Sequence, residues 1–258
     1  MTNRLTNGDR KPQAETPGIQ DFSQFNVRDS FSVPATDSSA VGGIPDADSQ
    51  TPQRISKRQL LETNSRLGVR DRQLLGAIQK YRYLMTGQVQ RLLFTNAANS
   101  SAGLRAASRN LKKLSELGLI DSLSRRIGGV RAGSSSLIWH ITHAGERLLR
   151  LHEQRAYSIR RHFEVSAYFL AHTLAVAETA IRLMEICRKY EPQLTDVQLE
   201  PACWRTYSNA GVSLSLKPDL YAATMSEEYE DRYFIEVDLD TESPAKIIEK
   251  CQKYHAYY

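Results

Sequence analysis

The segment 163–190 contains neither glycine nor proline, the two residues that most often end a helix. Within it Val165, Phe169, His172 and Val176 recur at spacings of three and four residues, which predicts one long helix with an apolar face. At 1.5 Å per residue such a helix would be about 42 Å long. We therefore expect a chain divided by a helix that either bridges two domains or pairs with a second copy in a homodimer. On that face His172 is interpreted as a core histidine rather than a ligand.

Charge is distributed unevenly on the two sides of this helix. The chain of 258 residues has a net charge of +5, but residues 54–161 contain 21 basic and 6 acidic side chains, a net +15. Residues 162–258 contain 9 basic and 16 acidic side chains, a net −7. Such a concentration of positive charge is typical of a module that binds nucleic acid. The basic part is therefore expected to bind double-stranded DNA, and the acidic part to have another role.

Composition excludes several classes of protein. No apolar run approaches the roughly 20 residues that span a bilayer, and the N-terminus has no signal pattern. The three cysteines, Cys187, Cys203 and Cys251, are too few and too widely spaced for a disulfide framework or a Cys-Cys zinc pair. We expect a cytoplasmic protein with no membrane partner. Residues 1–55 are poor in apolar side chains and predict a disordered arm.

The segment Ser101–Leu117 predicts an amphipathic helix with Ser101 as its N-cap. One face is apolar and consists of Leu104, Ala107, Leu111 and Leu114. Another face carries the residues that we expect to bind DNA, which are Arg105, Ser108, Arg109 and Lys112. A polar and basic face on a helix that follows two shorter helices is the arrangement that a helix-turn-helix inserts into the major groove.

Two β-like runs, 119–123 and 137–141, follow Gly118, which is expected to end this helix. Between them lies a glycine-rich tip with three further candidate DNA-binding residues, Arg125, Arg126 and Arg131. Thr142 is expected to cap the next helix. The stretch LKKLSELGLIDSLSRR…SSSLIWHITHAGERLL resembles a winged helix-turn-helix over residues 68–153. We assign a DNA-binding domain to residues 56–155.

The acidic part predicts three strands and a helix, at Val197–Tyr207, Val212–Thr224, Arg232–Leu239 and Pro244–Tyr258. Asp219 lies in the second predicted strand, and Glu236 and Asp238 share one face of the third. Three carboxylates on neighbouring strands would form a site for Mg²⁺ or Mn²⁺, which could activate water against a phosphodiester. Asp219, Glu236 and Asp238 are therefore the candidate metal ligands and catalytic residues.

This part resembles the restriction-endonuclease-like core, whose signature is Pro-Asp followed by Glu-x-Lys, here Pro218-Asp219 and Glu236-Val237-Asp238. The resemblance implies a mixed α/β domain over residues 156–258, in which Asp219 and Glu236 hold the metal. Asp238 stands where the family has its lysine, so Lys250 or Lys246 from the next helix would have to replace it, and Glu178 would add a carboxylate. Without such a lysine the domain is an inactive relative. The closing strand of this core is missing, which indicates a C-terminally incomplete domain.

The segments AHTLAVAE and EVDLDTES, with the winged-helix stretch before them, resemble the replication-relaxation family of bacterial plasmids and conjugative elements over residues 68–258. The overall prediction is an α+β protein with an N-terminal arm, a winged helix-turn-helix and a nuclease-like domain. The resemblance implies a DNA-binding protein that acts in replication initiation, or in DNA relaxation and mobilisation, at an origin. The alternatives are a metal-dependent nickase, a ligand-sensing winged-helix transcriptional regulator, and a relaxase that uses Tyr254, Tyr257 or Tyr258.

Overall fold

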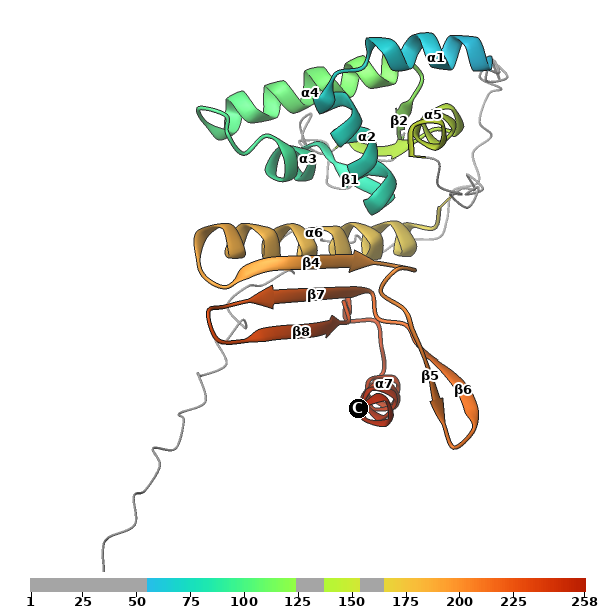
Figure 1. Ribbon diagram of the computed structural model, residues 1–258, viewed down its shortest axis with the longest axis vertical. Coiled ribbons are helices and arrows are strands. Elements are labelled where there is room, and N and C mark those ends of the chain that lie inside the picture. The colour runs from blue at the N-terminus through green and yellow to red at the C-terminus, as the bar shows by residue number, and fades with distance from the viewer. Residues whose placement is uncertain (1–54, 124–136, 154–164) are drawn as a thin grey trace, which may run out of the picture. The chain divides into compact units, whose positions relative to one another are not determined.

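The computed structural model describes residues 55–123, 137–153 and 165–258, which form a mixed α+β fold (Figure 1). The helices in this part of the chain are α1 (Lys57–Arg66), α2 (Val69–Tyr81), α3 (Thr86–Leu93), α4 (Ser100–Glu116), α5 (His143–Glu153), α6 (Ala167–Lys189) and α7 (Pro244–Tyr257). The strands are β1 (Tyr83–Met85), β2 (Ile120–Ser122), β3 (Ile138–Ile141), β4 (Gln193–Leu199), β5 (Arg205–Asn209), β6 (Val212–Leu216), β7 (Leu220–Met225) and β8 (Glu230–Ile235).

These strands form three antiparallel sheets, in the orders β1-β3-β2, β4-β7-β8 and β5-β6. Two predictions fall outside the described residues: the N-terminal arm, apart from Ile55, and the tip arginines Arg125, Arg126 and Arg131. The predicted domain boundary at 155/156 also lies in a segment that the structure does not describe.

Helix α1 and strand β1 are the two elements of the N-terminal half that the sequence patterns do not predict. In α1 the only buried residue is Leu60, so no apolar period marks the helix, and it begins instead with a capping box between Ser56 and Gln59. Strand β1 has three residues and exists through pairing with β3, in which Leu84 lies opposite Trp139. Helix α1 is thus marked by a local capping signal, whereas β1 depends on its tertiary pairing with β3.

Helix α4 matches its predicted range to within one residue, and its two ends explain the difference. Asn99, in extended conformation, accepts a hydrogen bond from the Ala102 amide at 2.8 Å, so Asn99 rather than Ser101 is the N-cap. At the other end Gly118 has φ +69, its amide donates to Ser115, and the Leu119 amide donates to Leu114. This is the Schellman arrangement, and it confirms Gly118 as the residue that ends the helix.

Two of the three predicted strands in the acidic part are each divided in two. The predicted strand Val197–Tyr207 ends as β4 at Leu199 and resumes as β5, because Pro201 has no amide hydrogen to continue the ladder. Pro218 likewise separates β6 from β7. Asp219 therefore precedes β7 instead of lying within it. The third predicted strand ends at Ile235, so Glu236 and Asp238 lie in the segment after β8.

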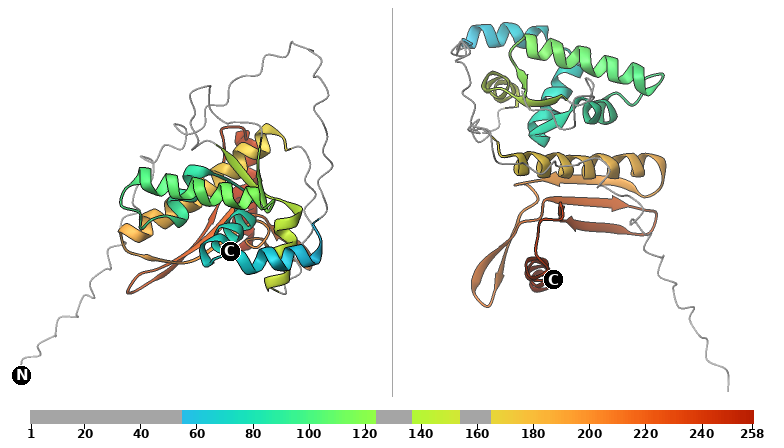
Figure 2. Two further views of the ribbon diagram at one scale, coloured as in Figure 1. Left: turned by 90° about the horizontal axis from the view of Figure 1, so that it is seen from above. Right: turned by 180° about the vertical axis from the view of Figure 1, so that it is seen from behind.

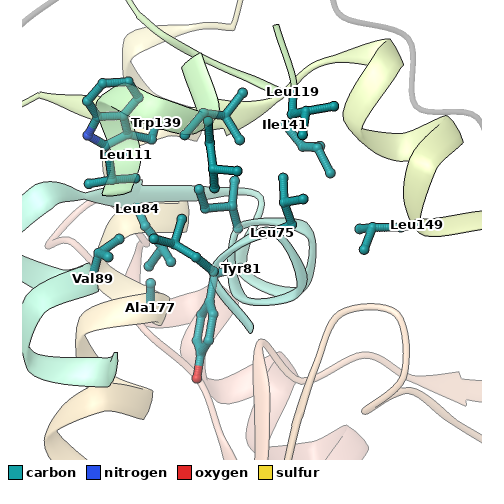
Figure 3. Close-up of a cluster of buried hydrophobic side chains, with 14 of the residues drawn as sticks. Leu75, Tyr81, Leu84, Val89, Leu111, Leu119, Trp139, Ile141, Leu149 and Ala177 are labelled. Atoms are coloured by element: carbon teal, nitrogen blue, oxygen red, sulfur yellow. The ribbon is translucent and has the colours of Figure 1, made fainter. Parts of the chain in front are cut away.

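Most of the buried apolar side chains form one cluster that extends from α1 to the start of β7. Its members in the N-terminal half include Leu75, Leu111 and Trp139, which Figure 3 draws together with Ala177 of α6. Leu199 and Leu220 of the β4-β7-β8 sheet, the central sheet, belong to the same cluster. Helix α6, predicted at 163–190 and observed at Ala167–Lys189, packs along β4, as Figures 1 and 2 show. Its apolar face is thus used inside the chain.

Candidate functional site

The outward face of α4 carries Arg105, Arg109 and Lys112, which are all exposed, and Ser108, which is half-buried. Arg105 and Arg109 make no hydrogen bond or ion pair with any residue that the structure describes. Lys112 Nζ lies 3.8 Å from the Glu116 carboxylate, but both side chains are exposed, and pairs of this kind contribute little. This face therefore presents cations to solvent, as the sequence pattern predicts.

Helix α4 is held by an ion pair to a buried carboxylate and by a close helix contact. Lys113 Nζ lies 2.6 Å from Asp71 of α2, a carboxylate that is 4% exposed and also accepts the Gly68 amide. A Cβ at Gly103 would lie 3.1 Å from Gln90 Nε2, so the absence of a side chain lets α3 and α4 approach closely. Both contacts fix the direction in which Arg105 and Arg109 point.

The predicted cap Thr142 joins the end of α4 to the start of α5. Its hydroxyl donates to the Gly118 carbonyl at 2.6 Å and accepts from the Gly145 amide at 3.2 Å. Gly145 packs against the backbone of Leu119, where an added Cβ would lie 2.1 Å from the carbonyl oxygen. The Thr-x-x-Gly spacing of the sequence therefore has a steric cause.

Glu178 does not join the other predicted catalytic carboxylates. Its carboxylate, 6% exposed, lies 2.6 Å from Arg91 of α3 and 2.9 Å from Arg182 on the next turn of α6. Gln88 donates to it as well, at 3.2 Å. Burial on its own would raise the pKa of Glu178, but the hydrogen bonds from Arg91 and Arg182 hold it below its usual value. Glu178 thus attaches α3 to α6, because two cations surround it there.

Asp219 is held on both of its oxygens. Oδ1 lies 3.1 Å from His172 Nε2 on α6, and Oδ2 accepts the backbone amide of Val237 at 2.8 Å. The hydrogen bond to Asp219 raises the pKa of His172 above its ordinary value. His172 is therefore half-buried and paired with a predicted catalytic residue, which differs from the core role that its position on an apolar face predicts.

Glu236 accepts hydrogen bonds from two residues of α7. Lys250 Nζ lies 2.9 Å from Oε2, and the Tyr254 hydroxyl lies 2.7 Å from Oε1. Lys250 also pairs with Glu242 at 2.8 Å. Burial on its own would lower the pKa of Lys250, but these two carboxylates raise it, so the side chain is a stable cation. Of the two lysines predicted to approach Glu236 from the last helix, Lys250 does so in the structure.

Asp238 has a local role, in which its Oδ1 accepts the backbone amides of Thr241 and Glu242 at 3.1 and 3.3 Å. These bonds lower the pKa of Asp238.

Each of the three predicted metal ligands is thus bound by donors of the protein itself. The described residues contain no group of three or more His, Cys, Asp or Glu side chains arranged to hold a metal ion. Mg²⁺ or Mn²⁺ binding by Asp219, Glu236 and Asp238 remains a prediction.

Asp219 and His172 also line a pocket whose other charged residues the sequence does not single out. These are Lys80 and Arg82 at the end of α2 and Glu200 after β4. No spacing could have identified this group, because its members come from distant segments.

The replication-relaxation family model matches residues 75–258, which include all of the residues around this pocket. The chain belongs to the replication-relaxation family.

The replication-relaxation match covers both α4 and the group around Asp219 and Glu236. Membership of this family associates the chain with the replication or relaxation of plasmids and other mobile elements. No curated protein and no solved structure matches the chain. Among the helices that the structure describes, none is both long enough and apolar enough to cross a membrane.

Proposed function

We propose that this replication-relaxation protein binds double-stranded DNA at the origin of a plasmid or other mobile element, with α4 in the major groove. In this proposal α3 and α4 form a helix-turn-helix, and the segment between β2 and β3 is its wing. Arg105, Ser108, Arg109 and Lys112 contact the major groove, and Arg125, Arg126 and Arg131 contact flanking phosphates.

The observation that carries the proposal is the exposure of Arg105 and Arg109 on the outward face of α4. Both guanidinium groups are exposed and have no partner in the described part of the chain, while the opposite face of α4 is fixed by Lys113, Asp71 and the core. Arginine pairs with guanine through two parallel hydrogen bonds, so unpaired arginines on a rigid helix suit base recognition. The net charge of +15 over residues 54–161 adds attraction to phosphates.

Binding to a labelled duplex from the origin region of the element that encodes the chain tests this function. Replacing Arg105 and Arg109 together by Ala should reduce the preference for the origin duplex over a scrambled duplex by about a hundredfold, because two base contacts are lost. Arg66→Ala is the control, since Arg66 is exposed on α1 and pairs with Glu62 on the same helix. Unchanged preference for the origin in the double variant would refute the role of α4.

A metal-dependent nickase is the second candidate, and the Glu236 to Lys250 contact favours it. Asp219 and Glu236 each adjoin a member of the paired residues Leu220 and Ile235, so they lie at neighbouring strand ends. Lys250 would supply the cation of the Glu-x-Lys signature, whose lysine position is occupied here by Asp238. Supercoiled plasmid incubated with Mg²⁺ or Mn²⁺ tests it. Nicking that Glu236→Gln and Lys250→Met both remove supports a nickase; equal nicking by all variants indicates contamination.

A homodimer through α6 is a further proposal. Many of the α6 side chains between Leu170 and Ile181 are already buried within the chain, so the remaining exposed ones would have to form its interface. A sedimentation measurement on the full chain decides it.

A further inference from the structure

The pocket beside Asp219 lies among the end of α2, the first half of α6 and the chain that follows β4. It is lined by Lys80, Arg82, His172, Glu200 and Asp219, together with apolar side chains of α6. Its volume of about 40 Å³ is enough for a few water molecules. A pocket of this size and polarity suits a small polar group better than a nucleobase.

Arg82 is the unusual member of the pocket. Its backbone has φ 67 and ψ −53, in the left-handed half of conformational space that side chains with a Cβ rarely adopt. Residues held in such conformations gather at binding and catalytic sites, where the surrounding structure maintains them. Arg82 is half-buried and makes no hydrogen bond or ion pair with any described residue. Its guanidinium therefore keeps donors that no described residue satisfies and that an anionic ligand could accept.

Of the pocket's lysine and arginine, Arg82 is the one without a partner in the described part of the chain, and the Tyr81 hydroxyl and His172 Nδ1 are also unpaired there. Lys80 Nζ already donates to the Val197 carbonyl at 2.9 Å. Asp219 is bound by His172 and by the Val237 amide, so its carboxylate is already occupied. Two formal cations, Lys80 and Arg82, balance two carboxylates, Glu200 and Asp219, so a singly charged anion enters without strong repulsion. The planar fork of arginine matches the oxygens of a phosphate.

We propose that Arg82 binds a phosphodiester of the DNA backbone in this pocket, beside His172 and Asp219. The inference rests on the proposed DNA-binding function and adds a contact separate from the outward face of α4. Arg82 belongs to the helical half of the chain, whereas Asp219 and Glu236 belong to the acidic half. The pocket is therefore where the two halves together contact one DNA backbone, which explains how a domain of net negative charge is held against a polyanion.

Fluorescence anisotropy with a labelled random-sequence duplex, repeated over a series of salt concentrations, tests the proposal on the full chain. Arg82→Gln should weaken binding by about tenfold, the effect of one lost charge-assisted hydrogen bond. It should also reduce the slope of log K against log salt by about one, because one fewer counterion is released. Arg66→Gln, which removes an exposed charge on α1 that pairs with Glu62, should change neither quantity. An Arg82→Gln variant equal to Arg66→Gln in affinity and slope would overturn the inference.

Arg82→Gly separates a binding role from a structural one. Glycine adopts positive φ without strain, so this variant should melt at the same temperature as the wild type or higher, while its affinity for the duplex falls as in Arg82→Gln. A lower melting temperature with unchanged affinity would assign Arg82 to the structure alone and overturn the inference.

The two proposals fail in different ways. A wild-type chain that binds no duplex even at low salt would overturn the DNA-binding function and this inference with it. Wild-type binding that depends on Arg105 and Arg109 but is unaffected by Arg82→Gln would overturn this inference alone.

Discussion

The Arg91 guanidinium on α3 lies 2.6 Å from the Glu178 carboxylate on α6, in a contact that also includes Glu185. Glu178 is 6% exposed and Arg91 is 30% exposed, so the carboxylate of this pair is shielded from water. The contact attaches the helix before α4 to the long helix that carries His172. Through it, the proposed recognition helix and the group around Asp219 belong to one connected framework.

Arg91→Ala is expected to destabilise the fold by about 3 kcal/mol, because a buried carboxylate loses its main cationic partner. Arg66→Ala removes an exposed pair with Glu62 and should cost less than about 1 kcal/mol. Urea unfolding of both variants gives the two free energies. Similar small losses in the two would mean that Arg182 and Gln88 satisfy Glu178 by themselves.

Acid should remove the contribution of Glu178. Its pKa in the folded chain lies below the ordinary value of 4.5, so its stabilisation is complete above that pH and is lost as the pH falls through the lower folded value. As the pH falls below 4.5, the unfolding free energy of the wild type should therefore fall more steeply than that of Glu178→Gln. Parallel pH dependences for the two proteins would contradict this assignment.

Gly145→Ala should destabilise the fold by about 1–3 kcal/mol or more, because the new Cβ would overlap the Leu119 carbonyl at 2.1 Å. Gly76→Ala is the matched control, since nothing lies within 4 Å of a Cβ at that helical position. The control should stabilise α2 by about 0.5–1 kcal/mol. Thermal melting distinguishes the two, and an equal change in both would show that the start of α5 yields to the extra atom.

Thr142→Ala should cost about 0.5–2 kcal/mol, because it removes the cap on Gly145 and the bond to the Gly118 carbonyl. Thr142→Ser keeps the hydroxyl and should retain most of the stability. Denaturant titration of both variants measures the difference. A serine variant as unstable as the alanine variant would attribute the effect to the methyl group instead of the hydroxyl.

Several features of the site follow from local sequence. The faces of α4, the αL glycine at Gly118 and the cap at Thr142 depend on residues within a few positions of one another, so their spacing predicts them. The extent of α6 follows in the same way from a segment without glycine or proline. Even the approach of Lys250 to Glu236 is predicted, because a helix directly follows the strand that ends beside that carboxylate.

The amino-acid sequence alone thus determined the helices other than α1, the division of charge and the family to which the chain belongs. The tertiary structure decided which donor each carboxylate meets. Glu178 pairs with Arg91, Asp219 bonds to His172, and Asp238 accepts the Thr241 amide. Pro201 and Pro218 each divide a predicted strand in two. The position of Arg82 in a pocket with His172 and Asp219 is likewise a feature of the tertiary structure alone. Helix periodicity and caps act over a few residues, whereas these contacts join segments that meet only when the core of α6 and the central sheet has formed.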